Sequence, residues 1–337
     1  MHWNHTDVGI PAPSTRIAVA VDSELFDERD LYSDRAYYVD YVIPIIDSLK
    51  RRFQEVAVVP VKNGHGAVDA LRDLQAFNPE LVFNTAFSAV AEEASFVGTL
   101  ELLGLRYTGA SMMGLLLASD KLKCCHLLSS QGIRVPAGII VDPHFAGDLP
   151  ILSYPIIVKP ALYGAASRGI YADSVVNGPR GLIRNVKRLW SNSYGPALCQ
   201  EFIIGREFRL SVIKGAGSAI HIVGVSECSF PRARPGWGYK TRALRSSQAA
   251  CKANGVSSAA LIPPADLQAR LSGLAVNALN AMDIQGPATL DLRMMENGTL
   301  VLIEVNANPG LTPKSDIWSS PSFDENILRI VAEALSR

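Results

Sequence analysis

Two oxygen-bearing side chains interrupt an apolar segment near the end of the sequence. The segment LVLIEVN, residues 300–306, is typical of a buried β-strand, yet it contains Glu304 and Asn306. Successive side chains of a strand point to opposite faces, so these two, which are two positions apart, share one face. A buried carboxylate is costly unless a proton, a partner or a cation compensates it. Because Mg²⁺ prefers oxygen ligands, the spacing favours a site for a hard cation.

A third oxygen donor belongs to the segment that precedes this strand. The sequence ATLDLRMMENGTLVLIEV, residues 288–305, predicts a β-hairpin that turns at ENG, residues 296–298. Such a hairpin pairs Asp291 of its first strand near Glu304 of its second. Three oxygen donors then meet on neighbouring strands, which makes them a candidate all-oxygen cation site.

The composition is that of a globular protein rather than of a membrane or nucleic-acid-coating one. The 337 residues are 48% hydrophobic and 19% charged, and 32 Lys and Arg balance 32 Asp and Glu. No overall field therefore favours nucleic acid or membrane, and no apolar run reaches spanning length. The sequence begins without the pattern of an export signal, and its five cysteines include no CxxC pair. These features predict reduced thiols and a cytoplasmic location.

The first third of the sequence alternates apolar strands with amphipathic helices. Residues 16–23, 56–61 and 80–86 are predicted as strands, and residues 36–53 and 67–77 as helices. Strands that alternate with helices are typical of a doubly wound parallel sheet. Its strand-end loops are expected to face a ligand.

The remaining sequence predicts two further units of strands and helices. A helix in residues 119–136 is expected to be capped by Ser119 or Asp120 and ended by Gly132. Residues 265–282 are predicted to form a helix, and residues 229–247 a long mobile loop without periodicity, which could close over a site. The predicted strands of these units are residues 138–141, 154–160, 196–203, 206–215, 219–227 and the hairpin 288–305.

Five segments occur in the order found in one enzyme family: LELLGLRYTGAS (100–111), SDKLKCCHLLSSQGIRVP (119–136), YPIIVKPALYGAASRGI (154–170), LCQEFIIGREF (198–208) and LDLRMMENGTLVLIEVNANPGLTPKSD (290–316). On these segments the sequence resembles the ATP-grasp carboxylate–amine ligases, and within them the D-alanine–D-alanine ligase-like branch. The resemblance implies an N-terminal doubly wound parallel α/β domain followed by two α+β units that grip ATP. The implied divisions are a flexible arm, a substrate-side domain, a central lid domain and a catalytic domain: 1–15, 16–118, 119–205 and 206–337.

The resemblance also implies which residues bind ATP and Mg²⁺. Asp291, Glu304 and Asn306 match the family's metal ligands, which would hold Mg²⁺, two ions being expected. Lys240 lies where the family's mobile loop offers a phosphate-binding lysine. The positions that match the family's contacts to ATP are two phosphate-binding lysines, the glycine-rich flap, the adenine-binding hinge and the ribose-binding residue: Lys121, Lys159, Gly164, Ser167, Gln200, Glu201, Ile203 and Glu207.

The amino-acid pockets depart from the family pattern. Thr289 stands where the family has an arginine that stabilises the tetrahedral intermediate, and Arg293 is the expected substitute, together with the backbone N–H of Gly310. Glu24 is a loose match to the glutamate that grips the first amine. In the family the serine after NPG contacts the second substrate, and Ser315 matches it. Its neighbours Lys314 and Asp316 are expected to lie at the same substrate pocket. Asp316 is either a solvated neighbour of Lys314 or a pocket residue that favours a cationic or hydroxyl-bearing substrate.

The predicted function is therefore ATP-dependent ligation of a carboxylate to an amine through an acyl phosphate, yielding ADP and phosphate. A specialised biosynthetic ligase is favoured, with a D-alanine–D-alanine ligase of cell-wall synthesis and a non-catalytic nucleotide-binding regulatory module as alternatives. The expected partners are small-molecule substrates and a second copy in a homodimer, without nucleic acid or membrane. Residues 232–245 also have the Arg and aromatic content of an RNA-binding segment, but a basic lid over phosphates fits their context better.

Overall fold

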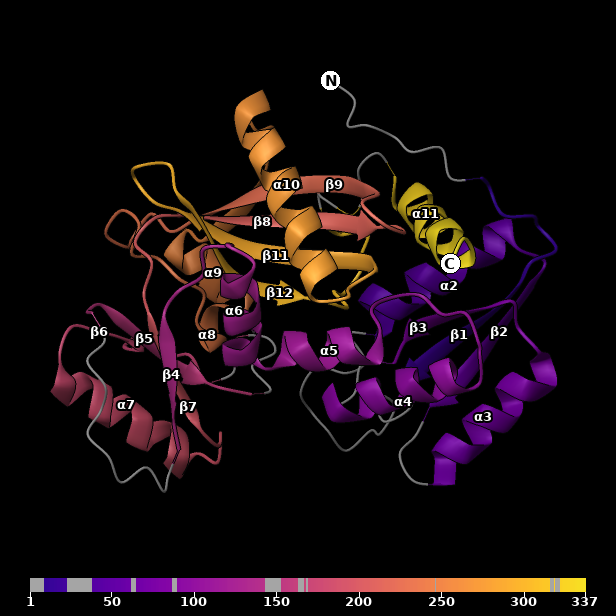
Figure 1. The fold of residues 1–337 in the computed structure, drawn as a ribbon, viewed down its shortest axis with the longest axis horizontal. Coiled ribbons are helices and arrows are strands. Elements are labelled where there is room, and N and C mark those ends of the chain that lie inside the picture. Colours follow the sequence, from indigo (N-terminus) through magenta and orange to yellow (C-terminus); the bar gives the residue numbers. More distant parts are fainter. Residues whose placement is uncertain are drawn as a thin grey trace.

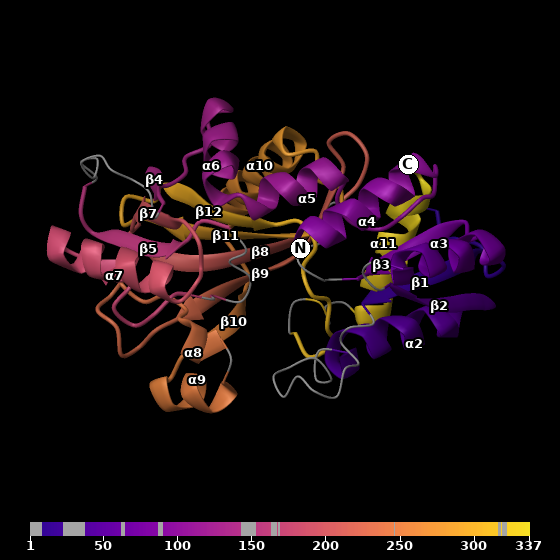
Figure 2. The same cartoon turned by 90° about the horizontal axis from the view of Figure 1, so that it is seen from below.

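The structure is a computed structural model, and it describes residues 9–22, 38–61, 65–86, 90–142, 153–162, 167, 169–245, 247–315, 318 and 322–337. The described residues form three sheets, one parallel and two antiparallel (Figure 1). The two antiparallel sheets lie at one end of the molecule, and the parallel sheet lies at the other (Figure 2).

The N-terminal sheet is parallel, as the alternation of strands and helices predicted. Its strands are β1 (Arg16–Asp22), β2 (Glu55–Val61) and β3 (Leu81–Thr85), in the order β2-β1-β3. Both faces are covered, which explains why β3 is buried along its whole length and β1 along all but its first residue. The helices of this unit are α2 (Ile43–Arg52), α3 (His65–Phe77) and α4 (Val90–Leu102), and a short π-helical segment (Tyr38–Val42) precedes α2.

The C-terminal helix completes the core of this N-terminal sheet. Helix α11 (Phe323–Leu335) packs its apolar face, including Ile327 and Val331, against β1 and α2. Arg51 of α2 binds Asp324 of α11 with an N–O distance of 2.6 Å. The last residues therefore pack with the first unit, although the sequence grouped them with the last. The limits of the domains remain predictions.

The central unit is a four-stranded antiparallel sheet. It contains β4 (Gly138–Val141), β5 (Ile156–Pro160), β6 (Val175–Val176) and β7 (Ala197–Glu201), in the order β4-β7-β5-β6. Helix α7 (Pro179–Ser191), which we did not predict, covers one face with its buried leucines and valine. Gly169 approaches this sheet so closely that a Cβ atom would lie 2.5 Å from Pro160, and its φ is +71°. Only glycine tolerates that position without strain.

The third sheet has five antiparallel strands and the largest core. Its order is β10-β9-β8-β11-β12. Apolar side chains of α4, α5, α6 and α10 pack against it. The elements are β8 (Arg206–Lys214), β9 (Ile220–Ser229), β10 (Ser257–Leu261), β11 (Gly286–Met294), β12 (Leu300–Asn306), α5 (Met112–Ser119), α6 (Lys121–Ser130) and α10 (Ala265–Ala281).

The predicted hairpin and helix cap are confirmed. Strands β11 and β12 pair with Asp291 directly opposite Glu304, and Gly298 ends the turn with a φ of +80°. Helix α6 begins after Asp120, whose side chain accepts a 3.0 Å hydrogen bond from the backbone of Lys123. This cap fixes where Lys121 stands, at the first position of the helix.

Two segments are more ordered than the sequence indicated. Within residues 229–247, which we call the lid segment, residues 242–245 form helix α8, and Ser247 caps helix α9 (Gln248–Asn254), so the prediction of an aperiodic loop was wrong there. In the predicted N-terminal arm, the carbonyls of Pro11 and Pro13 accept hydrogen bonds from Arg52 and Gln54. Residues 11–15 are thus anchored beside α2 rather than free. No helix in the described part of the chain is long and apolar enough to cross a membrane.

Candidate functional site

A cavity of about 140 Å³ lies between the two antiparallel sheets and the first turn of α6. It is closed on one side by the lid segment, through Tyr239 and Lys240. Most predicted site residues line it: Lys121, Lys159, Ser167, Gln200, Glu201, Ile203, Glu207, Lys240, Asp291, Arg293, Glu304 and Asn306. Sequence positions up to 185 residues apart therefore meet in one place.

The three predicted metal ligands lie on one wall of the cavity. Asp291 of β11 stands opposite Glu304 of β12, and Asn306 follows on the same face. Among the described residues no group of three His, Cys, Asp or Glu could hold a metal, so this set depends on the amide oxygen of Asn306. Two carboxylates and an amide are the hard oxygen donors that suit Mg²⁺, so the residues fit that ion.

Lysines face these oxygens from the other walls. The Lys121 ammonium lies 3.0 Å from Glu304, and both side chains are largely buried. Lys159 is only 5% exposed, and its burial lowers its pKa, while the Glu304 carboxylate opposes that shift. Lys240 completes the set from the lid segment. Ammonium groups in such a cavity are placed to bind an anionic ligand.

Arg209, which we did not predict, forms a bidentate ion pair in the cavity. Its Nε and Nη2 atoms lie 2.7 and 2.8 Å from the two carboxylate oxygens of Asp291. The two residues are direct cross-strand partners on β8 and β11. The sequence did indicate this position, because side chains alternate between the faces of a strand and Arg209 therefore shares a face of β8 with the predicted site residue Glu207.

Arg293 has a different role from the predicted one. It is 4% exposed, and its guanidinium donates to the carbonyls of Ile203, Gly236 and Gly238 and to Glu207. These bonds tie the lid segment to the hinge between the sheets. With its donors committed in this way, Arg293 is better placed to hold the lid than to stabilise an oxyanion.

The hinge carries a buried acceptor without a partner. Gln200 is 1% exposed, and its Nε2 atom lies 3.4 Å from both the Cys125 sulfur and the Pro136 carbonyl. Its Oε1 atom has no hydrogen-bond partner among the described residues. An unpaired buried acceptor in a cavity wall is costly unless a ligand donates to it. The predicted hinge therefore fits a ligand that carries an N–H donor.

The two cysteines of α6 pack in the interior. Cys124 and Cys125 are each 5% exposed, and burial raises the pKa of the Cys124 thiol to about 12. The five cysteines are all free thiols. A thiol this hard to ionise is unsuited to nucleophilic attack.

The remaining predicted residues do not line this cavity. Ser315 follows the Asn-Pro-Gly turn and accepts a 3.5 Å hydrogen bond from the backbone of Trp318. Lys314 binds Asp40 of the π-helical segment at 2.6 Å and is mostly exposed. Three predicted residues lie outside the described part of the chain: Glu24, Gly164 and Asp316.

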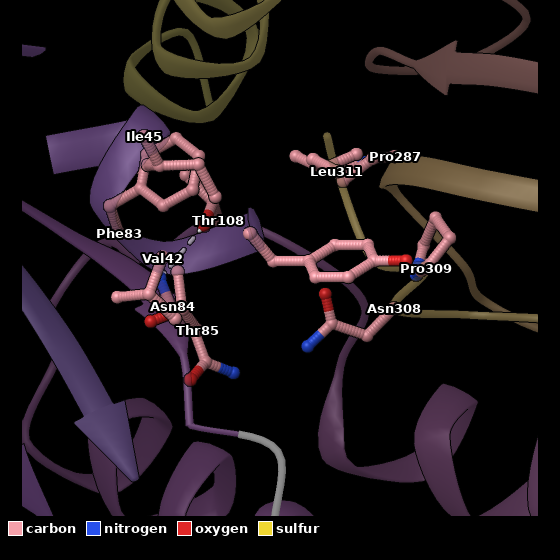
Figure 3. Close-up of a pocket in the computed structure, with 11 residues that line it drawn as sticks. Val42, Ile45, Phe83, Asn84, Thr85, Thr108, Pro287, Asn308, Pro309 and Leu311 are labelled. Carbon is pink, nitrogen blue, oxygen red and sulfur yellow. Dashed lines mark hydrogen bonds between the residues drawn. The ribbon is translucent and has the colours of Figure 1, made fainter. Parts of the chain in front are cut away.

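A second, smaller pocket lies where β3 ends beside this turn (Figure 3). Asn84 and Thr85 of β3 line it with Asn308 and Pro309, which face them across the pocket (Figure 3). Its volume is about 10 Å³, room for one water molecule, so a larger ligand requires the walls to separate. At Gly310 a Cβ atom would lie 2.7 Å from the Tyr41 ring, which explains why glycine occupies that position.

The buried carboxyl of Glu93 makes the stability of this junction dependent on pH. Glu93 of α4 accepts a 2.5 Å hydrogen bond from Asn308, and burial raises its pKa from 4.5 to about 7. A carboxyl with a raised folded-state pKa favours unfolding once it ionises, so stability falls as pH rises from about 4.5 to about 7. A shift of this size corresponds to about 3 kcal/mol.

Glu93→Gln should therefore raise the melting temperature at pH 8, where the wild-type carboxyl is charged, and change it little near pH 4.5. Glu92→Gln, at the exposed neighbouring position, is the matched control and should behave like wild type at both values. Thermal denaturation of the three proteins across this pH range measures the effect. Equal shifts for both variants would contradict the assigned cause.

Comparisons with known proteins give a consistent result. The family model described as D-ala D-ala ligase C-terminus matches residues 148–321. A D-alanine–D-alanine ligase of Caulobacter sp. (strain K31) is 30% identical over 280 residues, which cover 80% of this chain and 81% of the relative. A ligase of the same name from Gluconobacter oxydans (strain 621H) is 28% identical over 302 residues, covering 87% and 92%.

Solved structures share the fold at lower sequence identity. The ATP complex of the Bacillus anthracis D-alanine–D-alanine ligase superposes with a TM-score of 0.72 at 18% identity, covering 96% of this chain and 97% of that one. The VanG D-Ala:D-Ser ligase from Enterococcus faecalis gives 0.67 at 18% identity, covering 95% and 99%. The fold predicted from the sequence, a parallel α/β domain followed by two α+β units, is confirmed.

Proposed function

Because this chain belongs to the D-alanine–D-alanine ligase family of ATP-grasp enzymes, we propose that it is an ATP-dependent ligase that joins a carboxylate to an amine. One observation carries the proposal: three lysines, two carboxylates and an asparagine converge in a single cavity between two antiparallel sheets. A nucleotide-binding ligase requires cationic side chains that bind the phosphates and oxygen ligands that bind a metal ion.

The cavity offers a contact for each part of ATP. The orphaned Oε1 of Gln200 can accept a hydrogen bond from the adenine amino group, and Ile203 and Glu201 continue that hinge. Glu207 lies farther along β8, where a carboxylate can bind a ribose hydroxyl. Lys121, Lys159 and Lys240 then surround the phosphates.

Asp291, Glu304 and Asn306 would hold Mg²⁺. When bound, the ion neutralises charge that develops on the phosphate oxygens. In its absence the two carboxylates are balanced by Arg209 and Lys121. An incoming ion would compete with these two side chains for the carboxylates.

The proposed reaction has two steps. A substrate carboxylate attacks the terminal phosphorus of ATP, the bond to the bridging oxygen breaks, and ADP leaves. The amine of the second substrate then attacks the acyl phosphate, loses a proton and releases phosphate. Water must be kept out because it would hydrolyse the acyl phosphate, and the lid segment lies where it can do this.

D-Alanine is the first substrate to test, since the curated relatives are named for it. ATP hydrolysis should be screened against amino acids singly and in pairs, followed by product mass measurement. Release of ADP together with a D-alanyl-D-alanine mass is the expected result. ATP binding without turnover on any substrate would contradict the proposal and favour a non-catalytic regulatory module.

A ligase with a different substrate pair is the second candidate, because residues beside the reaction site differ from the family pattern. Thr289 stands where the family has an arginine, and it is buried opposite Ser211, so no guanidinium comes from that position. Lys314, next to the predicted substrate contact Ser315, is bound to Asp40. A product that forms only with another amine in the screen would support this specialised ligase.

The lid segment is held against the central sheet through Tyr239. Its hydroxyl lies 3.0 and 2.7 Å from the carbonyls of Tyr171 and Ala172. Tyr239→Phe should increase proteolysis within residues 229–247 roughly fivefold, because a lost hydrogen bond is worth about 1 kcal/mol. ATP, Mg²⁺ and substrate together should slow cleavage of the wild type. Tyr154→Phe, at an exposed position, is the control and should be cleaved like wild type. Equal cleavage of the wild type with and without these ligands would exclude a closing role.

We further propose that the protein forms a homodimer through an exposed apolar face of α4 and α5. These two helices lie next to each other (Figure 2). The exposed apolar side chains on them, or directly after α4, are Leu102, Leu103, Met112, Met113 and Leu116. Apolar side chains gathered in this way usually mark an interface. Met113→Glu should reduce the mass measured by light scattering to that of one chain, whereas the control Ile262→Glu, on another exposed apolar side chain, should not. A monomeric wild type would exclude the dimer.

A further inference from the structure

Arg209 occupies the nucleotide cavity, but the reaction outlined above gives it no task. Both of its hydrogen bonds go to Asp291, with distances of 2.7 and 2.8 Å. The side chains are 29% and 21% exposed, so the pair is partly desolvated and open toward the cavity. A bidentate pair in these surroundings is stronger than a surface ion pair.

This pair conflicts with metal binding at Asp291. Arg209 already occupies both carboxylate oxygens. Mg²⁺ requires an oxygen at about 2.0–2.1 Å and brings two positive charges to the same carboxylate. The guanidinium and the ion repel each other at that distance. Loading of the metal therefore weakens the hold of Asp291 on Arg209.

A released guanidinium has a ready partner in the same cavity. Arg209 shares one face of β8 with Glu207, which we place at the ribose. Its guanidinium also lies close enough to Glu304, the partner of Lys121, for their charges to interact. That places its head group beside the proposed phosphates. The planar fork of arginine matches two phosphate oxygens as well as it matches a carboxylate.

We propose that Arg209 is an exchange residue, which neutralises Asp291 in the nucleotide-free protein and transfers its two hydrogen bonds to a phosphate group when Mg²⁺ and ATP bind. This inference rests on the proposed nucleotide site. Under this proposal, Arg209 contacts ATP only after the metal has displaced the guanidinium from Asp291. Removing Arg209 must then affect metal and nucleotide in opposite directions.

The test measures the two ligands separately. In Arg209→Gln, Mn²⁺ alone, followed by electron paramagnetic resonance without nucleotide, should bind about tenfold more tightly because the guanidinium no longer occupies the Asp291 carboxylate. A non-hydrolysable ATP analogue with Mg²⁺, measured by calorimetry, should bind about tenfold more weakly, since a charge-assisted hydrogen bond is lost. Arg206→Gln is the matched control, because Arg206 forms a similar bidentate pair with Glu227 on the other face of β8. It should change neither affinity.

A reciprocal variant keeps the inference testable if Arg209→Gln does not fold. Asp291→Asn removes the competing carboxylate, so Arg209 is free before any metal binds. In EDTA, this variant should bind ATP about fivefold more tightly than wild type. If the pair is purely structural, Arg209→Gln should bind Mn²⁺ more weakly than wild type, or Asp291→Asn should bind ATP in EDTA as wild type does. Either result overturns the exchange. Wild-type protein that binds no ATP would overturn the proposed function and this inference together, whereas a failed exchange leaves wild-type ligation intact.

Discussion

Glu304→Gln is expected to lower ATP turnover by at least about 100-fold while leaving the fold intact. Glu304 serves two groups: it is the proposed metal ligand opposite Asp291, and its Oε1 atom lies 3.0 Å from the Lys121 ammonium. Glutamine keeps the size of the side chain but removes the charge. It can neither balance Lys121 nor attract a divalent cation with the same strength.

Steady-state release of phosphate measures this effect, and circular dichroism reports whether the variant is folded. Glu296→Gln is the matched control, because Glu296 lies on the turn of the same hairpin and is exposed. The control should retain wild-type turnover. Near-normal turnover in folded Glu304→Gln would falsify the assignment of the metal site.

Arg293→Gln is expected to cost about 3–5 kcal/mol of unfolding free energy, the largest stability loss we predict. The arginine is nearly fully buried and donates to the carbonyls of Ile203, Gly236 and Gly238. It also binds Glu207 at 2.7 Å and stacks over the Phe202 ring at 4.6 Å. Glutamine is shorter and neutral, so Glu207 and several buried carbonyls lose their partner.

Urea unfolding measures the loss, with Arg270→Gln as the control. Arg270 also donates to a backbone carbonyl, that of Gly298 at 2.6 Å, but it is exposed, so its variant should lie within about 0.5 kcal/mol of wild type. The comparison also separates two roles of Arg293. A stable Arg293→Gln protein with greatly reduced turnover would restore the oxyanion role that its observed hydrogen bonds argue against.

The features that the sequence determined are those whose cause is local. Short apolar runs placed the strands of the parallel sheet, and Asp120 and Gly132 set the ends of α6. The turn at residues 296–298 is short enough to fix register, so Asp291 and Glu304 could be paired by counting. Two cation-site residues were therefore readable from one hairpin. The segment match added the lysines and the hinge, which line the same cavity.

The tertiary structure alone decided how these local pieces share their partners. Arg209 and Asp291 are 82 residues apart, and Arg293 and Glu207 are 86 apart, so no local pattern indicates that they pair. The same holds for Glu93 with Asn308. Their contacts follow from the order of strands within a sheet and from the packing of one unit on another. Those arrangements depend on the burial of whole faces, to which a single residue contributes little. The sequence determines the charge and the hydrogen-bonding groups of each side chain. Folding determines which of several possible partners lies within bonding distance.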